Sequence, residues 1–362
     1  MKRTGTANAP LHGGHCPPWL FDHMKTLSGA IIEAIIIEYG TKEVLRRFAD
    51  PVWFQSFGSV LGFDWHSSGL TTVVLGAFKE AWNQRSGEYG LFVAGGKGKA
   101  SRRTPEEIDQ AGSDHGLSLD CKRLVYSSRL AAKVDSGLVQ DGYQLYHHVF
   151  LFDKDGAWTV VQQGMHQSEP VARRYHWLSL TLDRFTETPH QGIAGQPEPH
   201  VLDLTAKPNL PVQQASVELA QRPQDALLAL RTLVESQDGA RHLTMPEYHN
   251  VPRPGYFNKI LYKIYDAQPQ DYEALTALPG VGASTLRALA MVSEVVYGTP
   301  LAFQDPVRYA FAHGGKDGTP FPVRRPDYEA TIASLERAIQ TARLGDLDKM
   351  KAFRRLSHAA GT

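Results

Sequence analysis

The sequence predicts an α+β protein in which a mixed α/β N-terminal domain is followed by an all-helical domain. A chain of 362 residues exceeds the usual size of a single domain. Strand and helix patterns both occur before a proline-rich stretch, and helical spacing alone follows it. We therefore expect a mixed α/β domain over residues 1–190, a linker or wrapping segment over 191–222 and a helical domain over 223–362.

The expected N-terminal domain contains recognisable helices and a pair of strands. Apolar residues at spacings of three and four predict helix across residues 19–47, with a break at Gly40. Thr104 followed by Pro105 and Glu107 is typical of a helix start. Residues 143–163 predict a β-hairpin, because apolar side chains alternate on both sides of an Asp-Lys-Asp-Gly turn.

The expected second domain has helical patterns throughout. Residues 226–234 and 256–264 have helical spacing, and a final helix is predicted over 327–355. The proline-rich residues 189–223 show no sustained period, which is why we assign most of them to a linker or wrapping segment.

Composition excludes several classes of protein. The chain has 38 Lys and Arg against 38 Asp and Glu, which disfavours a protein that coats nucleic acid by bulk electrostatics. With two cysteines, Cys16 and Cys121, no disulfide framework is expected. The N-terminus lacks a signal-peptide pattern, and the best apolar run is too short to span a bilayer. We expect a cytoplasmic protein without a membrane partner.

The most specific motif joins two of the helices predicted in the second domain. Pro279 ends the first helix, since it has no amide hydrogen and discourages helical geometry at the preceding residue. Gly280 and Gly282 allow positive φ and the close approach of another backbone. The unpaired amides at the start of the second helix form an anion site. The sequence thus predicts a phosphate-contacting turn made of Gly280, Val281, Gly282, Ser284 and Thr285.

This motif, over about residues 272–296, resembles the helix-hairpin-helix superfamily. The resemblance implies contacts with the nucleic-acid backbone that carry no sequence information. It also implies an activity, because in the glycosylase branch a catalytic aspartate follows the hairpin, and Asp305 stands in that order after Pro300. Ser284 occupies the place of the Schiff-base lysine of bifunctional members, so no lyase activity is expected. A tight helix-helix corner without a ligand is the simpler alternative.

Polar residues of the N-terminal domain offer a different chemistry. Asp64, Asp135 and Asp141 are candidate ligands for Mg²⁺ or Mn²⁺, which would activate water against a phosphodiester. His66 or His147 would then act as acid or base. None of the spacings is diagnostic of a metal site. The alternative is that these residues are turn aspartates and buried core histidines.

A basic, glycine-rich loop lies in the same domain. It lacks the spacing of a P-loop, so ATP hydrolysis is not expected. Cations on a flexible loop suit a chain of phosphates, and a solvated loop is the alternative. The expected phosphate contacts are Lys97, Lys99, Arg102 and Arg103.

Over its whole length the chain resembles an uncharacterised prokaryotic family of unknown function. The resemblance lies in the runs LHGG (11–14), GFDWHSSG (62–69), VAGGKGK (93–99), QDGYQLYHH (140–148) and FAHGGKDG (311–318). It implies one full-length family and supplies no activity.

Together these features predict a DNA-processing enzyme. Metal-dependent nuclease activity in DNA repair or recombination is the leading hypothesis. N-glycosidic cleavage by Asp305 and DNA binding without catalysis are the alternatives.

Overall fold

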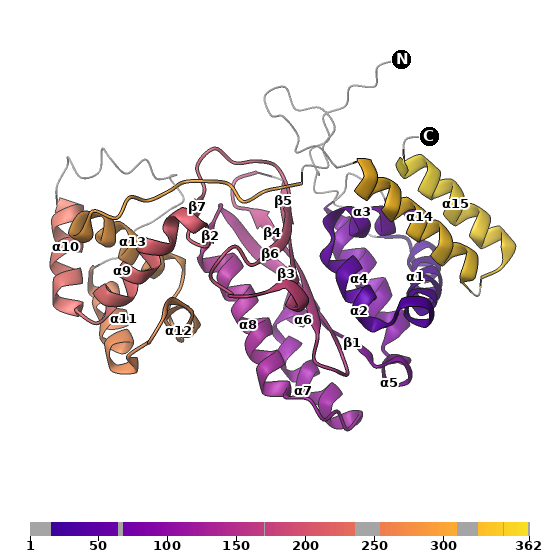
Figure 1. Ribbon diagram of the computed structural model, residues 1–362, viewed down its shortest axis with the longest axis horizontal. Coiled ribbons are helices and arrows are strands. Elements are labelled where there is room, and N and C mark those ends of the chain that lie inside the picture. Colours follow the sequence, from indigo (N-terminus) through magenta and orange to yellow (C-terminus); the bar gives the residue numbers. More distant parts are fainter. Residues whose placement is uncertain are drawn as a thin grey trace, which may run out of the picture.

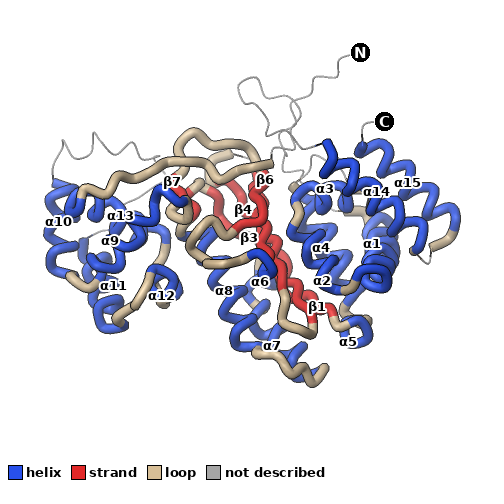
Figure 2. The backbone as a smooth tube through the Cα atoms, in the orientation of Figure 1, coloured by secondary structure: helices blue, strands red, loops and turns tan. Residues whose placement is uncertain are grey.

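The computed structural model describes residues 16–63, 68–169, 171–235, 254–309, 325–342 and 344–360. Within these residues, a five-stranded antiparallel sheet stands between two groups of helices (Figure 1). The fold is therefore mixed α and β, as the sequence predicts. Figure 2 shows the strands enclosed between helices on both sides. Antiparallel sheets commonly leave one face to water, so burial of both faces explains why the strands here are apolar at consecutive positions.

The main sheet has the strand order β1-β3-β4-β5-β6. Its strands are β1 (Leu91–Lys97), β3 (Tyr143–Asp153), β4 (Trp158–His166), β5 (Ala172–Leu178) and β6 (His190–Ala194). The expected hairpin is confirmed, with Phe152 paired to Trp158 across the turn. A second, two-stranded ladder joins β2 (Val139–Gln140) to β7 (Leu202–Asp203).

One face of the sheet is covered by the N-terminal helices. Alternate residues of β3, such as Val149 and Leu151, enter this core. The helices of this layer are α1 (Pro18–Tyr39), α2 (Thr41–Ala49), α3 (Pro51–Val60), α4 (Gly69–Trp82), the short α5 (Ser86–Tyr89), α14 (Arg325–Thr341) and α15 (Asp346–Ala360). None of the helices in the described ranges combines the length and apolar character needed to cross a bilayer.

The opposite face packs on α8, and the remaining helices continue that core. Phe150 and Phe152 enter it from β3, so the two faces of one strand serve two separate cores. The helices of this side are α6 (Lys99–Arg102), α7 (Thr104–Asp114), α8 (Cys121–Gly137), α9 (Leu210–Ala220), α10 (Pro223–Glu235), α11 (Pro254–Ala267), α12 (Tyr272–Ala277) and α13 (Ala283–Tyr297).

The boundaries expected from the sequence differ from this arrangement in two places. Residues 191–222, expected to be a linker or wrapping segment, contain most of β6 together with β7 and α9. Residues 327–355 were expected to form one helix. They lie instead in two helices, because α14 ends at Thr341 and α15 begins at Asp346. Leu335 of α14 and Leu356 of α15 pack into the N-terminal core, so these helices do not extend the α9–α13 group.

Candidate active site and nucleic-acid interface

A cavity of about 460 Å³ lies where β6, β7 and residues 304–308 meet. Residues 301–309 run back from α13 across the end of the sheet (Figure 1). Backbone hydrogen bonds between Tyr309 and both Ile193 and Gly195 fix this segment against β6. The polar and charged side chains at the wall of the cavity are Thr188, His190, Asp203, Thr205, Lys207, Gln304, Asp305 and Arg308.

His190 is held in place by a buried carboxylate. Its Nε2 lies 2.5 Å from Oδ1 of Asp135, which is fully buried on α8. The other carboxylate oxygen, Oδ2, accepts hydrogen bonds from Gln162 Nε2 at 2.5 Å and from Trp177 Nε1 at 3.0 Å. The Trp177 ring also meets the imidazole edge-on, with centroids 4.7 Å apart. These contacts fix both the position of the ring and the nitrogen that faces the carboxylate.

The hydrogen-bonded chain continues away from the cavity. Gln162 Oε1 faces His148 Nδ1 at 2.8 Å, and His148 Nε2 faces Ser128 Oγ at 2.8 Å. The amide nitrogen of Gln162 donates to Asp135, so the amide oxygen of Gln162 is the atom that faces His148. This oxygen accepts a hydrogen bond, and His148 therefore carries its hydrogen on Nδ1. The Ser128 hydroxyl then donates to the unprotonated Nε2 of His148. Burial lowers the pKa of His148, which agrees with a neutral ring.

A second buried network joins Asp141 to Asp305 through one guanidinium. Arg173 Nη1 lies 3.0 Å from Asp141 Oδ2, and Arg173 Nη2 lies 2.8 Å from Asp305 Oδ2. Arg173 and Asp141 are fully buried, whereas the Asp305 side chain reaches the cavity wall. The Tyr175 hydroxyl donates to Asp141 at 2.6 Å. The guanidinium also lies over the Tyr143 ring, 4.6 Å from its centroid.

Asp203 adds a carboxyl group of different character to the same cavity. Burial raises its pKa, although hydrogen bonds from the Thr205 amide and hydroxyl and the charge of His190 act in the opposite direction. Nearby, Thr188 has a φ of 43°, which is strained for a β-branched residue. Strain of this kind clusters at functional sites. The wall thus offers a carboxyl that holds its proton more readily than usual, an imidazole, and the cationic side chains of Lys207 and Arg308.

The residues expected to bind a metal ion are not brought together in the described part of the chain. Asp64 and His66 lie outside the described residues. Asp135 is bound to His190, and Asp141 to Arg173. No three His, Cys, Asp or Glu side chains gather as a ligand set within the described ranges. His147 shares the sheet face of Val149, whereas His148 faces α8 and Asp135.

His147 is buried with both ring nitrogens lacking a hydrogen-bond partner among the described residues. Burial lowers its pKa to about 3, and the charges of His148 and Lys97 act in the same direction. A ring with this pKa is neutral in the folded protein and takes up a proton near pH 6.5 in the unfolded chain. Its contribution to stability is therefore present above pH 6.5 and is lost as the pH falls toward 3.

We expect His147→Leu to make the free energy of unfolding less dependent on pH in the acidic range. Between pH 6 and pH 5, the free energy of unfolding of the wild type should fall more steeply than that of the variant, by nearly the limit of about 1.4 kcal/mol per pH unit that one full proton gives. Urea unfolding at a series of pH values measures both slopes. Equal slopes would show that His147 is not kept neutral by burial.

The turn between α12 and α13 has the expected positive φ at Gly280, whereas Gly282, expected to need the same freedom, is extended with a φ of −136°. The first helix ends at Leu278 (ψ 136°), and Gly280 has a φ of 89°. Val281 turns inward into the core shared with Leu275 and Leu286, as the sequence predicts. Gly282 is the N-cap of α13, and no side chain of the described residues caps it. Gly280 and Gly282 are exposed and Ser284 is partly exposed, whereas Val281 and Thr285 are buried, so the expected phosphate contacts of these two side chains are wrong. The exposed part of the turn presents an uncapped helix N-terminus, an arrangement that favours anions.

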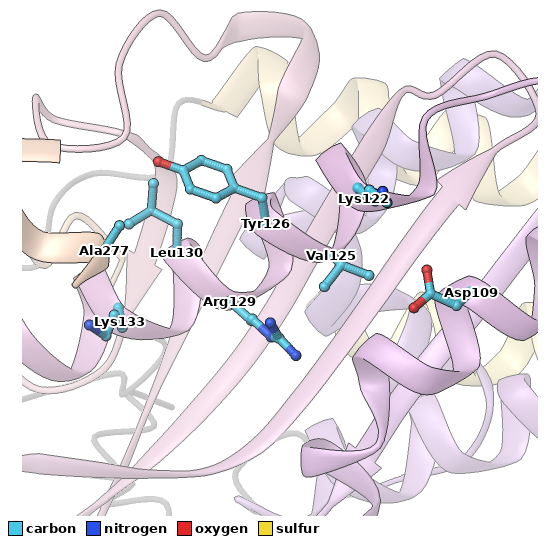
Figure 3. A pocket seen from close by; sticks show the side chains of 8 residues that line it. All are labelled: Asp109, Lys122, Val125, Tyr126, Arg129, Leu130, Lys133 and Ala277. Atoms are coloured by element: carbon cyan, nitrogen blue, oxygen red, sulfur yellow. The ribbon is translucent and has the colours of Figure 1, made fainter. Parts of the chain in front are cut away.

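Helix α8 anchors this turn. Lys133 Nζ donates to the carbonyl oxygens of Thr276 at 2.8 Å and Leu278 at 2.5 Å. A pocket of about 330 Å³ opens between α8 and α12, and Figure 3 shows Lys122, Arg129 and Lys133 among the side chains that line it. Of these cations, Lys133 is the one that contacts the turn, and it uses part of its hydrogen-bonding capacity to hold the α12 carbonyls.

The turn and the cavity lie on two sides of β2. Gln140 Nε2 donates to the Ala283 carbonyl at 3.1 Å, and Arg287 Nε donates to Gln140 Oε1 at 2.6 Å. The next residue, Asp141, belongs to the Arg173 network at the cavity. On β7, Leu202 pairs with Gln140 and precedes Asp203. A ligand held at the start of α13 is therefore one strand away from the cavity wall.

The four cations expected on a flexible loop are exposed, but the segment is ordered: Lys97 ends β1, and Lys99 and Arg102 lie in α6. Lys97, Lys99, Arg102 and Arg103 all face solvent. Arg103 Nη2 lies 3.7 Å from Glu107 Oε1, so its charge is partly balanced. Lys97 Nζ lies over the Tyr146 ring, 6.0 Å from its centroid. Contact with nucleic acid by this loop stays a prediction.

Sequence reasoning missed His190, Asp203 and Arg173 as parts of one site. His190 borders the stretch that was expected to be a linker and Asp203 lies within it, so neither had a local pattern. A usable signal did exist in Gln162 and Arg173. Both stand in strands that are almost entirely buried, and a buried polar side chain needs a buried partner.

Comparisons with known proteins identify the family and no activity. No curated protein and no solved structure matches the chain. A family model matches residues 5–323, which is most of the sequence. The chain belongs to the family described as protein of unknown function DUF763.

Proposed function

We propose that this protein is a nucleic-acid-processing hydrolase that cleaves the backbone in the cavity beside His190. One observation carries the proposal. An imidazole fixed by a buried carboxylate faces a cavity with cationic side chains, one strand away from an uncapped helix N-terminus. The α12–α13 turn would hold a phosphate, and the cavity would receive a neighbouring one.

The cavity has the groups that phosphodiester hydrolysis requires. His190 can take a proton from water, since an imidazole supported by a carboxylate is an effective general base near neutral pH. Asp203, with its raised pKa, can give a proton to the departing oxygen. Lys207 and Arg308 can stabilise the charge that develops on the phosphate.

The described carboxylates are poor candidates for a divalent ion. Asp135 and Asp141 each face a basic side chain, and Asp305 accepts from Arg173 with both oxygens. Metal ligands need free lone pairs at the cavity, and these groups offer few. We derive no step through a metal ion. Dependence on Mg²⁺ or Mn²⁺ stays a prediction, which a chelator tests.

N-glycosidic cleavage is the second candidate, because Asp305 lines the same cavity. A carboxylate there could stabilise the cationic sugar as the base departs. The bond to Arg173 weakens the case, since the guanidinium offsets part of the negative charge.

The test uses end-labelled single- and double-stranded DNA and RNA, with Mg²⁺, with Mn²⁺ and with chelator. Products are separated before and after hot alkali. Direct strand breaks support backbone hydrolysis, and breaks that need alkali support N-glycosidic cleavage. If the protein bound nucleic acid but formed no product, both backbone hydrolysis and N-glycosidic cleavage would be contradicted. The protein would then bind nucleic acid without catalysis.

The turn itself is tested by Gly282→Ala. Gly282 is extended, with a φ of −136°, and an added Cβ meets no atom within 4 Å, so the fold should tolerate alanine. The methyl group would occupy the path of a phosphate toward the α13 amides, so we expect several-fold weaker binding of nucleic acid. Fluorescence anisotropy at fixed low salt measures this effect. Gly280→Ala is less informative, because a φ of 89° makes alanine strained.

Gly345→Ala is the matched control, since this glycine is also exposed and open to a Cβ but precedes α15. Its affinity should equal that of the wild type. Unchanged affinity of Gly282→Ala would remove the turn from the proposed binding site.

A further inference from the structure

We infer that the outward face of α11 is a stacking surface for an unpaired nucleic-acid strand. This inference rests on the proposed function and names the form of nucleic acid that the site would receive. The face consists of Tyr256, Lys259, Tyr262, Lys263 and Tyr265.

The aliphatic residues of α11 point inward. Phe257, Ile260, Leu261 and Ile264 are all buried in the core shared with α9 and α13. What remains outside is aromatic and charged. The exposed fractions of Tyr256, Tyr262 and Tyr265 are 52%, 43% and 43%.

Helix α11 contacts the α12–α13 turn through its inner side. A Cβ added to Gly280 would lie 3.3 Å from Ile260 Cδ1, so the inner side of α11 touches the turn directly. Figure 1 shows α11 beside α12. The tyrosines therefore stand on the same helix that contacts the turn.

The chemistry of the face favours nucleic acid over a protein partner. A protein-binding helix usually offers aliphatic anchors, and here those are buried. Lys259 and Lys263 lie one turn apart, between Tyr256 and Tyr262 around the helix. Both lysines are exposed and form no ion pair within the described ranges, and Asp266 is the acidic neighbour on the same side. Aromatic rings that stack on bases, with cations that follow the phosphates, are typical of single-strand binding.

The dimensions also fit a short stretch of strand. Tyr256 and Lys263 are seven residues apart, which is about 10 Å along a helix. That length corresponds to roughly three nucleotides at the rise of one strand in a duplex. Paired bases are stacked on one another and cannot offer their faces to tyrosine, so the surface should distinguish unpaired from paired strands.

The double variant Tyr256→Ala/Tyr262→Ala tests the inference in the full-length chain. Binding of a labelled single-stranded oligonucleotide should weaken by about ten-fold or more, while binding of a duplex changes little. Tyr256→Phe/Tyr262→Phe should keep the wild-type affinity, because stacking needs the ring and not the hydroxyl. Tyr39→Ala is the matched control, as its exposed fraction of 42% is similar and it lies on α1.

The outcomes separate this inference from the proposed function. Wild-type affinity of the double alanine variant for single strands would overturn the inference. The proposed function would survive that result if the Gly282 variant still weakened binding. If the wild-type protein bound neither single strands nor duplex, the proposed function and this inference would both fail.

Discussion

His190→Gln is expected to lower the rate of backbone cleavage by about 10²- to 10⁴-fold, the usual contribution of a general base. Glutamine can keep a hydrogen bond to Asp135, so the cavity should retain its shape. An amide is not basic at neutral pH and cannot accept a proton from water, so the attacking water would lose its base. Binding of nucleic acid should remain near the wild-type value, because the α12–α13 turn is unchanged.

The measurement is single-turnover cleavage of a labelled strand with enzyme in excess, together with anisotropy on the same oligonucleotide. His200→Gln is the matched control, because His200 is exposed on the connection between β6 and β7. Wild-type rates in His190→Gln would remove the imidazole from the reaction. Equal loss of rate and of affinity would instead assign His190 to binding.

Arg173→Met should cause the largest loss of stability, about 3–5 kcal/mol. The guanidinium is fully buried between Asp141 and Asp305, and its removal leaves two carboxylates without their cation. Burial already raises the pKa of Asp141, and Arg173 opposes that shift. Without the guanidinium, Asp141 should take up a proton at a still higher pH.

Urea unfolding of the variant and of Arg184→Met measures the difference. The Arg184 side chain is 75% exposed and lies 4.0 Å from Glu187, so its removal should cost less than about 0.5 kcal/mol. Adding Asp141→Asn to Arg173→Met should recover part of the lost stability. A loss below about 1 kcal/mol in Arg173→Met would show that the buried network is not essential to the fold.

Features set by neighbouring residues were predictable from the sequence. The β3–β4 hairpin follows from alternation around its turn, and the inward position of Val281 follows from the Pro-Gly-Val-Gly order. Each depends on a few consecutive residues, where steric rules act directly.

The site was not predictable, since partners far apart in the chain form it. His190 and Asp135 are 55 residues apart, and Arg173 and Asp305 are 132 residues apart. Asp305 was expected to act in one domain and Asp141 in another, yet Arg173 binds both. No local period or motif encodes a pairing of this kind.

The packing of α14 and α15 against the N-terminal helices has a consequence for folding kinetics. Arg355 donates to the Val60 carbonyl across 295 residues, and Leu335 and Leu356 belong to the same core as Phe57. Contacts with such long sequence separation require closure of a very large loop, which slows folding. During synthesis, the layer around α1–α4 would stay incomplete until α14 and α15 had left the ribosome. Chaperone dependence of this layer, and its early opening in hydrogen exchange, would follow from that order of assembly.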